Sequence, residues 1–194
     1  MTATPSALQD PQQALVHAHS PDEPTRAAGL ARLAAFLPQA GRRYDARRNV
    51  DFGPTDRSNV SMLSAWIRHR LVCEDEDVQA VLARHTSGAA EKFIQEVVWR
   101  TYWKGWLEMR PAVWQCYRDA VEDRLRQLDK DRDLRSRWEE ATSGRTGIAC
   151  FDQWTGELLD TGYLHNHARM WFSSIWIFTL RLPWELGAVF SSAS

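Results

Sequence analysis

The sequence predicts an all-α protein. Apolar residues recur every three or four positions along most of the chain, which is the periodicity of a helix with one buried face. Glycine and proline punctuate these segments, and no convincing series of strands with period-two alternation is found. With 194 residues, 44% of them hydrophobic, the chain can enclose one sizeable core. We therefore expect a single globular helical domain.

The first part of the chain has little periodicity. Residues 1–21 are rich in Ala, Gln, Pro and His, and we expect a disordered lead-in followed by one helical domain over 22–194. A helix is predicted over 24–37, where a proline and a glycine stop it. Glycine, proline, aspartate and asparagine then predict a long loop over 41–59.

From residue 61 onward the sequence predicts one helix after another. Pro111 suits a first helical turn, whereas Gly144, Gly147, Gly162 and Pro183 separate the later segments. The predicted helices are Ser61–Leu71, Asp75–Arg84, Ala89–Met109, Pro111–Leu128, Leu134–Thr142, Cys150–Asp160 and Tyr163–Leu180.

The composition argues against several classes of protein. A net charge of −1 gives no general attraction for nucleic acid, so any DNA binding must come from a local patch. Three cysteines without CxxC spacing predict neither a disulfide framework nor a zinc ribbon, and they favour a reducing cytoplasm. No basic region with a following apolar run opens the chain, and no apolar stretch reaches the roughly 20 residues that span a bilayer. We expect a soluble, cytoplasmic protein that is not exported.

The helix predicted over 89–109 carries an aromatic stripe that includes a carboxylate. Glu96, Trp99, Trp103 and Trp106 recur at helical spacing and so share one face. Tryptophans at this spacing usually belong to the core. The alternative is a stacking surface for a planar ligand, with Glu96 as a hydrogen-bond acceptor beside it.

The last predicted helix places three polar residues on one face of a strongly apolar segment. Asn166, Arg169 and Ser173 follow helical spacing, and Arg169, if buried, must meet an acid, an anionic ligand or water. His165 and His167 lie two positions apart and are expected to point away from each other. Because no third ligand converges on them, we expect no metal site.

Two long motifs and one shorter segment carry a family resemblance. The segment Thr161-Gly-Tyr-Leu-His-Asn-His-Ala-Arg-Met170 resembles the TGYxHNxxRM signature of the FAD-binding domain of the DNA photolyase/cryptochrome family. Glu91-Lys-Phe-Ile-Gln-Glu-Val-Val-Trp-Arg100 resembles that family's E-(L/V)-x-W-R helix, and Ser61-Met-Leu-Ser64 resembles the end of its TSxLS segment. The similarity extends in order over about residues 40 to 187.

The resemblance implies an FAD cofactor in a helical bowl. Its implied FAD contacts are Tyr44, Val60, Ser61, Met62, Leu63, Ser64, Trp99, Asn166 and Arg169. Hydroxyls at Ser61 and Ser64 beside N–H groups at a helix start would suit the pyrophosphate. Trp184 matches the middle member of the family's tryptophan electron relay.

The resemblance also implies light-driven repair of pyrimidine dimers in DNA. Glu96 and Trp99 match the acid and the indole that meet the lesion, and we take them as the catalytic pair. The implied DNA contacts are Arg48, Glu96, Trp99, Arg100, Trp103 and Asn166. An Asn at position 166 is typical of the branch that repairs cyclobutane dimers, whereas the six-four branch tends to place His there.

Departures from the family pattern leave alternatives open. Val60 replaces a threonine, and Gly156 stands where the family tends to have an arginine. The chain also ends soon after Trp184, before segments that complete the family's flavin site, and no antenna domain precedes the helices. We therefore expect no antenna chromophore and a partial, impaired FAD site. The alternatives are a flavin photosensor that does not repair DNA, or a fragment without cofactor that acts as an interaction module.

Overall fold

The computed structural model describes residues 23–193. Over this range the chain forms helices joined by turns and loops, and it contains no strand, which confirms the all-α prediction. The expected disordered lead-in at residues 1–21 lies outside the described residues. Contacts within the chain gather into two compact units that meet in sequence at Val113 and Trp114. We name their described parts the N-terminal unit (23–113) and the C-terminal unit (114–193), and the single domain expected from sequence stays a prediction.

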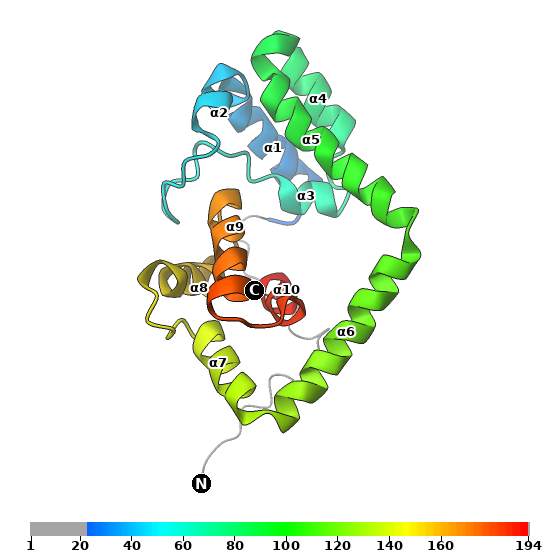
Figure 1. Ribbon diagram of the computed structural model, residues 1–194. Helices are drawn as coiled ribbons and strands as arrows, with labels where there is room; N and C mark the ends of the chain where they lie inside the picture. Colours follow the sequence, from blue (N-terminus) through cyan, green and yellow to red (C-terminus); the bar gives the residue numbers. More distant parts are fainter. Residues whose placement is uncertain (1–22, 194) are drawn as a thin grey trace. The chain divides into compact units, whose positions relative to one another are not determined.

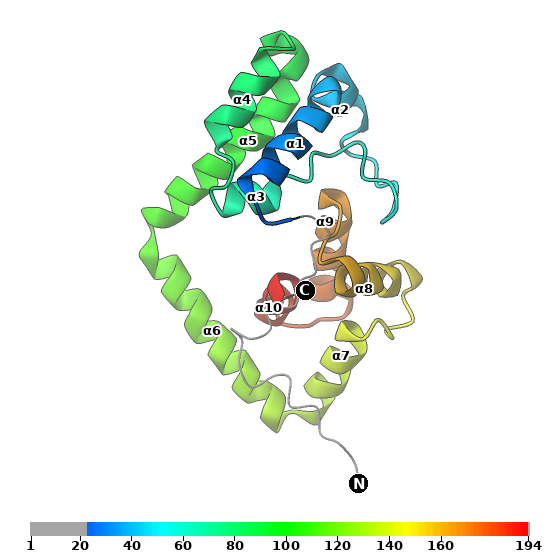
Figure 2. The ribbon, with the colours of Figure 1, turned by 180° about the vertical axis from the view of Figure 1, so that it is seen from behind.

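The N-terminal unit packs its other helices against a long helix, α5. In chain order it holds α1 (Arg26–Phe36), the 3-10 helix η2 (Leu37–Gln39), α2 (Arg42–Arg47), α3 (Ser64–Arg68), α4 (Glu74–Leu82) and α5 (Ser87–Glu108). Figures 1 and 2 show α4 beside α5 from opposite sides, and α2 also contacts α5. The hydroxyls of Thr25 and Thr86 cap α1 and α5 by accepting backbone N–H groups of the first turn.

The core of the N-terminal unit consists of two apolar clusters. One joins the end of α1 to α4 and α5 through buried residues that include Phe36, Val81 and Phe93. The other surrounds the buried indole of Trp66 and includes Leu63. This arrangement fixes α3 and the residues before it against α1, which positions a segment of the predicted site.

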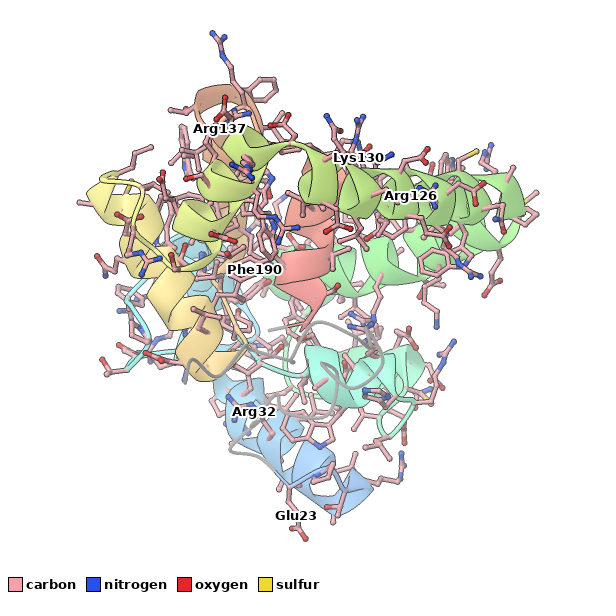
Figure 3. All side chains as sticks on the ribbon, turned by 90° about the horizontal axis from the view of Figure 1, so that it is seen from below. Glu23, Arg32, Arg126, Lys130, Arg137 and Phe190 are labelled. Atoms are coloured by element: carbon pink, nitrogen blue, oxygen red, sulfur yellow. The ribbon has the colours of Figure 1, made fainter. Side chains whose placement is uncertain are left out.

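The C-terminal unit encloses one core built on stacked aromatic rings. The helix α6 (Pro111–Lys130) leads into it, followed by α7 (Arg132–Thr142), α8 (Ala149–Thr161), α9 (Asn166–Ser174), the π-helix η3 (Ile175–Thr179) and α10 (Trp184–Ala193). Phe151 and Phe172 stack at 4.4 Å between ring centroids. Phe190 of α10, labelled in Figure 3, stacks on Phe172 at 6.3 Å and on Trp176 at 6.1 Å. The core therefore ties α8, α9, η3 and α10 together.

Helix boundaries differ from the prediction where the backbone leaves the helical region. The helix expected over 61–71 is limited to α3, because Met62 and Arg70 adopt left-handed φ angles of 56° and 59°. The helix expected over 163–180 begins only at Asn166, since His165 is its non-helical N-cap, and it widens to a π-helix from Ile175.

The long loop expected over 41–59 is wrong in its first part, where α2 forms. Gly41 precedes this helix and Tyr44 packs edge-on against the rings of Phe36 and Phe93, at 6.0 and 5.3 Å between centroids. The contact with Phe93 comes from a residue distant in sequence, so local composition did not reveal it. No helix within 23–193 has both the length and the apolar character needed to cross a membrane.

Candidate functional site

In the N-terminal unit, a hydrogen-bonded loop leads into the predicted FAD-contacting segment. Asn59 is buried, and its side-chain amide donates to the backbone oxygens of Arg47 and Val50, at 2.8 and 2.7 Å. Arg57 pairs with the carboxylate of Asp51 at 3.1 Å. These contacts give the loop a defined conformation although it lacks regular secondary structure. Asn59 was not predicted as a site residue, because an asparagine shortly before the segment Ser61–Ser64 does not by itself indicate a structural role.

The segment from Val60 to Ser64 is held from both sides. The Nε of Arg32 on α1 donates to the backbone oxygen of Ser61 at 2.9 Å. Leu63 is buried in the cluster around Trp66, and the Ser61 hydroxyl accepts its N–H at 3.4 Å. Met62, between them, takes a left-handed φ, and Val60 is half-buried. The Ser61 hydroxyl is thus engaged within the segment, whereas Ser64 begins α3 with an exposed side chain.

Arg100 connects α5 to this segment. One guanidinium nitrogen donates to the backbone oxygen of Ser64 at 3.2 Å. Burial lowers the pKa of the Arg100 guanidinium from its ordinary value, but arginine pKa values are so high that the side chain stays charged near neutral pH. A cation and an exposed hydroxyl therefore lie close together at the start of α3.

A second pair on α5 joins the predicted catalytic acid to a predicted DNA contact. The guanidinium of Arg48, which follows α2, lies 2.6 Å from the carboxylate of Glu96. One helical turn further along α5 lies Trp99, whose side chain is 52% exposed. The structure thus brings three predicted site residues, from two separate stretches of sequence, to one region of the N-terminal unit.

The tryptophans of α5 form a surface, not a core. Trp99 and Trp103 are each 52% exposed and stack at 6.4 Å with 24° between their planes. Tyr102 contacts both rings, and Trp106 meets Trp103 edge-on at 5.8 Å. The buried face of the helix is lined instead by Phe93 and its neighbours. Of the two interpretations of the aromatic stripe, the exposed rings favour the stacking surface.

In the C-terminal unit, α9 presents the polar face that the sequence predicted, but to solvent. Asn166, Arg169 and Ser173 are outside the core, while Ala168 and Phe172 face it. Arg169 therefore needs no buried acidic partner. Its exposure leaves the guanidinium able to meet an anion without the cost of burying a charge.

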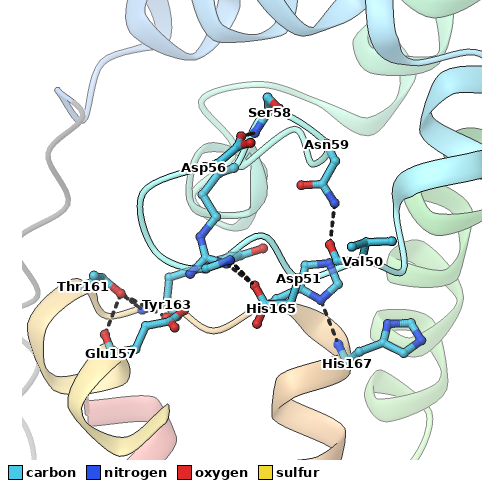
Figure 4. Close-up of polar contacts among 12 residues, drawn as sticks. Val50, Asp51, Asp56, Ser58, Asn59, Glu157, Thr161, Tyr163, His165 and His167 are labelled. Atoms are coloured by element: carbon cyan, nitrogen blue, oxygen red, sulfur yellow. Dashed lines mark hydrogen bonds and ion pairs between the residues drawn. The ribbon is translucent and has the colours of Figure 1, made fainter. Parts of the chain in front are cut away.

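The two histidines at the start of α9 do not point apart as expected. His165 is buried as the N-cap, its Nδ1 accepts the backbone N–H of His167 at 3.3 Å, and the two rings lie 5.8 Å apart (Figure 4). The prediction was wrong because it treated both as helical, whereas His165 precedes the helix. Within residues 23–193, no group of three His, Cys, Asp or Glu side chains could hold a metal ion.

Trp184, the predicted relay residue, begins α10. Its ring lies 5.5 Å from that of Tyr117 on α6 and its side chain remains 51% exposed. The next residue, Glu185, is buried and lies 3.6 Å from Arg124. The indole is therefore packed on one aromatic neighbour and open to solvent.

These observations define a helical protein with two sets of candidate site residues. The N-terminal unit carries a fixed serine segment and an acid beside exposed indoles, and the C-terminal unit carries an Asn–Arg face on α9. Residues 93–193 match the family model described as the FAD binding domain of DNA photolyase. The chain belongs to this family. Tyr44, Arg48 and the segment Val60–Ser64 lie outside the matched range.

Curated relatives are similar over most of this chain. The deoxyribodipyrimidine photo-lyase of Escherichia coli is 27% identical over 188 residues, which cover 93% of this chain and 37% of that protein. A deoxyribodipyrimidine photo-lyase of Thermus thermophilus is 30% identical over 166 residues, covering 84% of this chain and 37% of the relative. The chain thus spans little more than a third of the length of these relatives.

A solved structure supports the same fold. The crystal structure of a bacterial class III photolyase from Agrobacterium tumefaciens aligns with a TM-score of 0.69 and 25% sequence identity. The alignment covers 88% of this chain and 34% of that one.

Proposed function

We propose that this chain binds FAD and serves in light-driven repair of cyclobutane pyrimidine dimers in DNA. The family, a FAD-binding domain of DNA photolyase, and the relatives named deoxyribodipyrimidine photo-lyase support this proposal. Because the chain spans only part of those relatives, their whole-protein activity is carried over as a proposal. We also propose a cytoplasmic location, since the three cysteines are free thiols, as a reducing compartment maintains them.

The observation that carries the proposal is the Arg48–Glu96 ion pair beside the exposed indole of Trp99. A base turned out of the DNA stack can lie on Trp99 while the Glu96 carboxylate accepts a hydrogen bond from an N–H on its pairing edge. Stacking on an aromatic side chain is worth roughly 1–3 kcal/mol per base. Arg48 holds the carboxylate in place before the base arrives, which reduces the ordering needed on binding.

Both units offer side chains that suit FAD. The exposed Ser64 hydroxyl beside the Arg100 guanidinium provides the donor and the cation that a pyrophosphate needs. Asn166 and Arg169 offer an amide and a second guanidinium from α9. Tyr44 is held by Phe36 and Phe93, so little side-chain entropy remains to be lost on contact with a ligand.

The protein's own part in the reaction is to bind, orient and shield. If bound in its reduced form, FAD would supply an electron to the dimer after illumination and would regain it once the dimer had split, so that the reaction has no net redox change. Trp99 and Glu96 hold the lesion in one orientation, and the apolar rings of Trp99 and Trp103 displace water from it. Trp184 is proposed to relay electrons, and its exposed ring is accessible to a dissolved reductant.

Binding of the FAD-loaded chain to DNA with and without one cyclobutane dimer tests this function. We expect a preference for the dimer that Trp99→Ala reduces by roughly 1–3 kcal/mol and Glu96→Gln reduces by about 1 kcal/mol. Glu91→Gln is the matched control, because this exposed acid lies on the same helix, outside the predicted site.

Illumination then separates repair from the alternatives. Loss of dimers from the bound DNA, dependent on Trp99 and Glu96, is the expected result. An FAD-bound chain without preference for the dimer would support a flavin photosensor instead. A folded chain that binds neither FAD nor DNA would support an interaction module.

A further inference from the structure

An open groove in the C-terminal unit has no role in the function proposed above, apart from the one residue Trp184. It has a volume of about 480 Å³, within the range of small-molecule sites. The end of α6, the first part of α7 and the turn that leads into α10 form its walls. The side chains that matter here are Arg124, Gln127, Arg137, Arg181, Pro183 and Trp184.

The acids of the groove are already engaged. Glu185 is buried against Arg124, with 3.6 Å between Oε1 and Nε. Asp131 caps α7 by accepting the backbone N–H of Leu134 at 3.0 Å. Of the three arginines that line the groove, two therefore have no acidic partner among its other lining residues.

Arg137 and Arg181 are these two residues. Arg137, on α7 in Figure 3, donates one N–H to the backbone oxygen of Leu180 at 3.2 Å, which satisfies a single donor and neutralises no charge. The side chain of Arg181 makes no hydrogen bond or ion pair with any residue in the range 23–193. A guanidinium presents five N–H donors in a planar fork that fits phosphate oxygens. The groove thus offers two charged forks for an anion.

The turn that presents Arg181 is fixed on both sides. The N–H of Leu182 donates to the backbone oxygen of Trp176 at 3.0 Å, and the indole N–H of Trp176 donates to the Pro183 oxygen at 2.9 Å. Arg181 adopts a left-handed φ of 52°, which a side-chain-bearing residue seldom does without tertiary support. Its position is therefore imposed by the fold, as a preorganised binding residue requires.

An aromatic wall completes the groove. The ring of Trp184 lies 5.5 Å from that of Tyr117, at 31° between planes, and half of the indole stays exposed. A supported indole next to two guanidiniums without acidic partners in the groove suits a ligand that joins a planar ring to a phosphate.

We propose that this groove binds a mononucleotide, with its phosphate on Arg137 and Arg181 and its base against Trp184. The site lies wholly within the C-terminal unit and shares only Trp184 with the residues assigned to the photolyase-type function. The proposal does not depend on FAD binding, and the two can fail independently.

Calorimetric titration of the 194-residue chain with adenosine monophosphate tests the site. We expect saturable binding, with adenosine and inorganic phosphate each at least about tenfold weaker because each lacks half of the recognised chemistry. Arg137→Gln and Arg181→Gln should each weaken binding about five- to tenfold. Arg126→Gln and Arg132→Gln are the controls, since these exposed arginines lie on α6 and α7 outside the groove, and they should leave binding unchanged.

Two further arms keep the outcome unambiguous. Arg181→Gly removes the cation while it suits the left-handed backbone, so this variant should fold and still lose affinity. Ser64→Ala, which should weaken FAD binding, should leave nucleotide binding unchanged. Absence of binding, equal affinity for adenosine, equal loss in the control variants, or a loss in Ser64→Ala would each overturn the proposal.

Discussion

The buried tryptophans of the two units differ in how their polar atoms are satisfied. Trp176 in the C-terminal unit donates its indole N–H to the Pro183 oxygen. Trp66 in the N-terminal unit has no acceptor for its N–H among residues 23–193, and neither carboxylate oxygen of the fully buried Asp77 has a hydrogen-bond partner there. Each such group costs about 1–3 kcal/mol. The N-terminal unit therefore carries this cost in buried residues, whereas the unsatisfied atoms of the C-terminal unit, Arg124 Nε and His167 Nδ1, belong to half-buried side chains.

The same contrast extends to the predicted site. In the N-terminal unit the site residues are tied to one another, through Arg48 with Glu96 and Arg100 with Ser64. In the C-terminal unit Asn166 and Arg169 project from a well-packed helix into solvent. The predicted site residues of the N-terminal unit are thus ordered by polar contacts with one another. Those of the C-terminal unit lie on a helix whose opposite face packs into the aromatic core.

The largest effect is expected from breaking the aromatic core. Phe172→Ala removes the ring that stacks on both Phe151 and Phe190, so the free energy of unfolding should fall by about 3–5 kcal/mol. Phe178→Ala is the control, because that ring is 75% exposed, and it should change stability by less than about 0.5 kcal/mol. Urea unfolding measures both. Equal losses in the two variants would show that the stacked core is not what stabilises this unit.

The buried acid of the N-terminal unit should make stability depend on pH. Burial, with the nearby charges of Glu74 and Glu76, raises the pKa of Asp77 to about 7. The unfolded carboxyl titrates near pH ~4, so between about pH 4 and 7 folding retains a proton that the unfolded chain releases. The contribution of Asp77 to the free energy of unfolding is thus most favourable below that window and falls as pH rises through it. After discounting for solvent screening, we expect the free energy of unfolding to fall by roughly 2 kcal/mol across the window.

Unfolding in urea at about pH 5 and about pH 8 checks this expectation, and Asp77→Asn should flatten the difference. The exposed neighbour Asp75→Asn should not. Arg26 holds the pKa of Glu76 down at about 2. This ion pair therefore loses its contribution to stability only below the pH range of the comparison, and it does not add to the difference between the two pH values. A pH slope that persists in Asp77→Asn would assign it to another group.

A smaller effect on stability is expected when two helical glycines are replaced by alanine, and its sign should differ between them. A Cβ on Gly29 of α1 would lie 2.7 Å from the Trp66 ring, whereas one on Gly156 of α8 meets no atom within 4 Å. Gly29→Ala should destabilise the protein by about 1–3 kcal/mol through overpacking. Gly156→Ala should stabilise it by about 0.5–1 kcal/mol through helix propensity. Thermal unfolding of the two variants tests the opposite signs, and a loss in Gly156→Ala would mean that α8 is more crowded than the structure shows.

Sequence periodicity predicted the elements whose contacts are local. The stripe on α5 and the polar face of α9 follow from helical spacing alone, and both are present. Exposure was harder to predict, because whether Trp99 is core or surface depends on what packs beside it. The same applies to Arg169, whose place in an apolar segment made burial a reasonable expectation.

Long-range contacts account for what was missed. Asn59 orders its loop through the carbonyls of Arg47 and Val50, and Arg32 reaches Ser61 from a different helix. The left-handed backbone of Met62, which shortens α3, has no glycine to signal it. Such features arise only when separate segments meet, so a single sequence without its fold does not display them.

FAD titration of the purified chain, followed by flavin fluorescence and absorption, tests the central claim most directly. We predict saturable binding of one FAD, weakened by about 1 kcal/mol in Ser64→Ala through loss of a hydroxyl contact, and weakened further in Arg169→Gln. Ser136→Ala, an exposed serine on α7 outside the predicted site, should bind as the parent does. A folded chain that leaves the flavin spectrum and fluorescence unchanged, or that binds FAD equally well in all three variants, would contradict the assignment of this site.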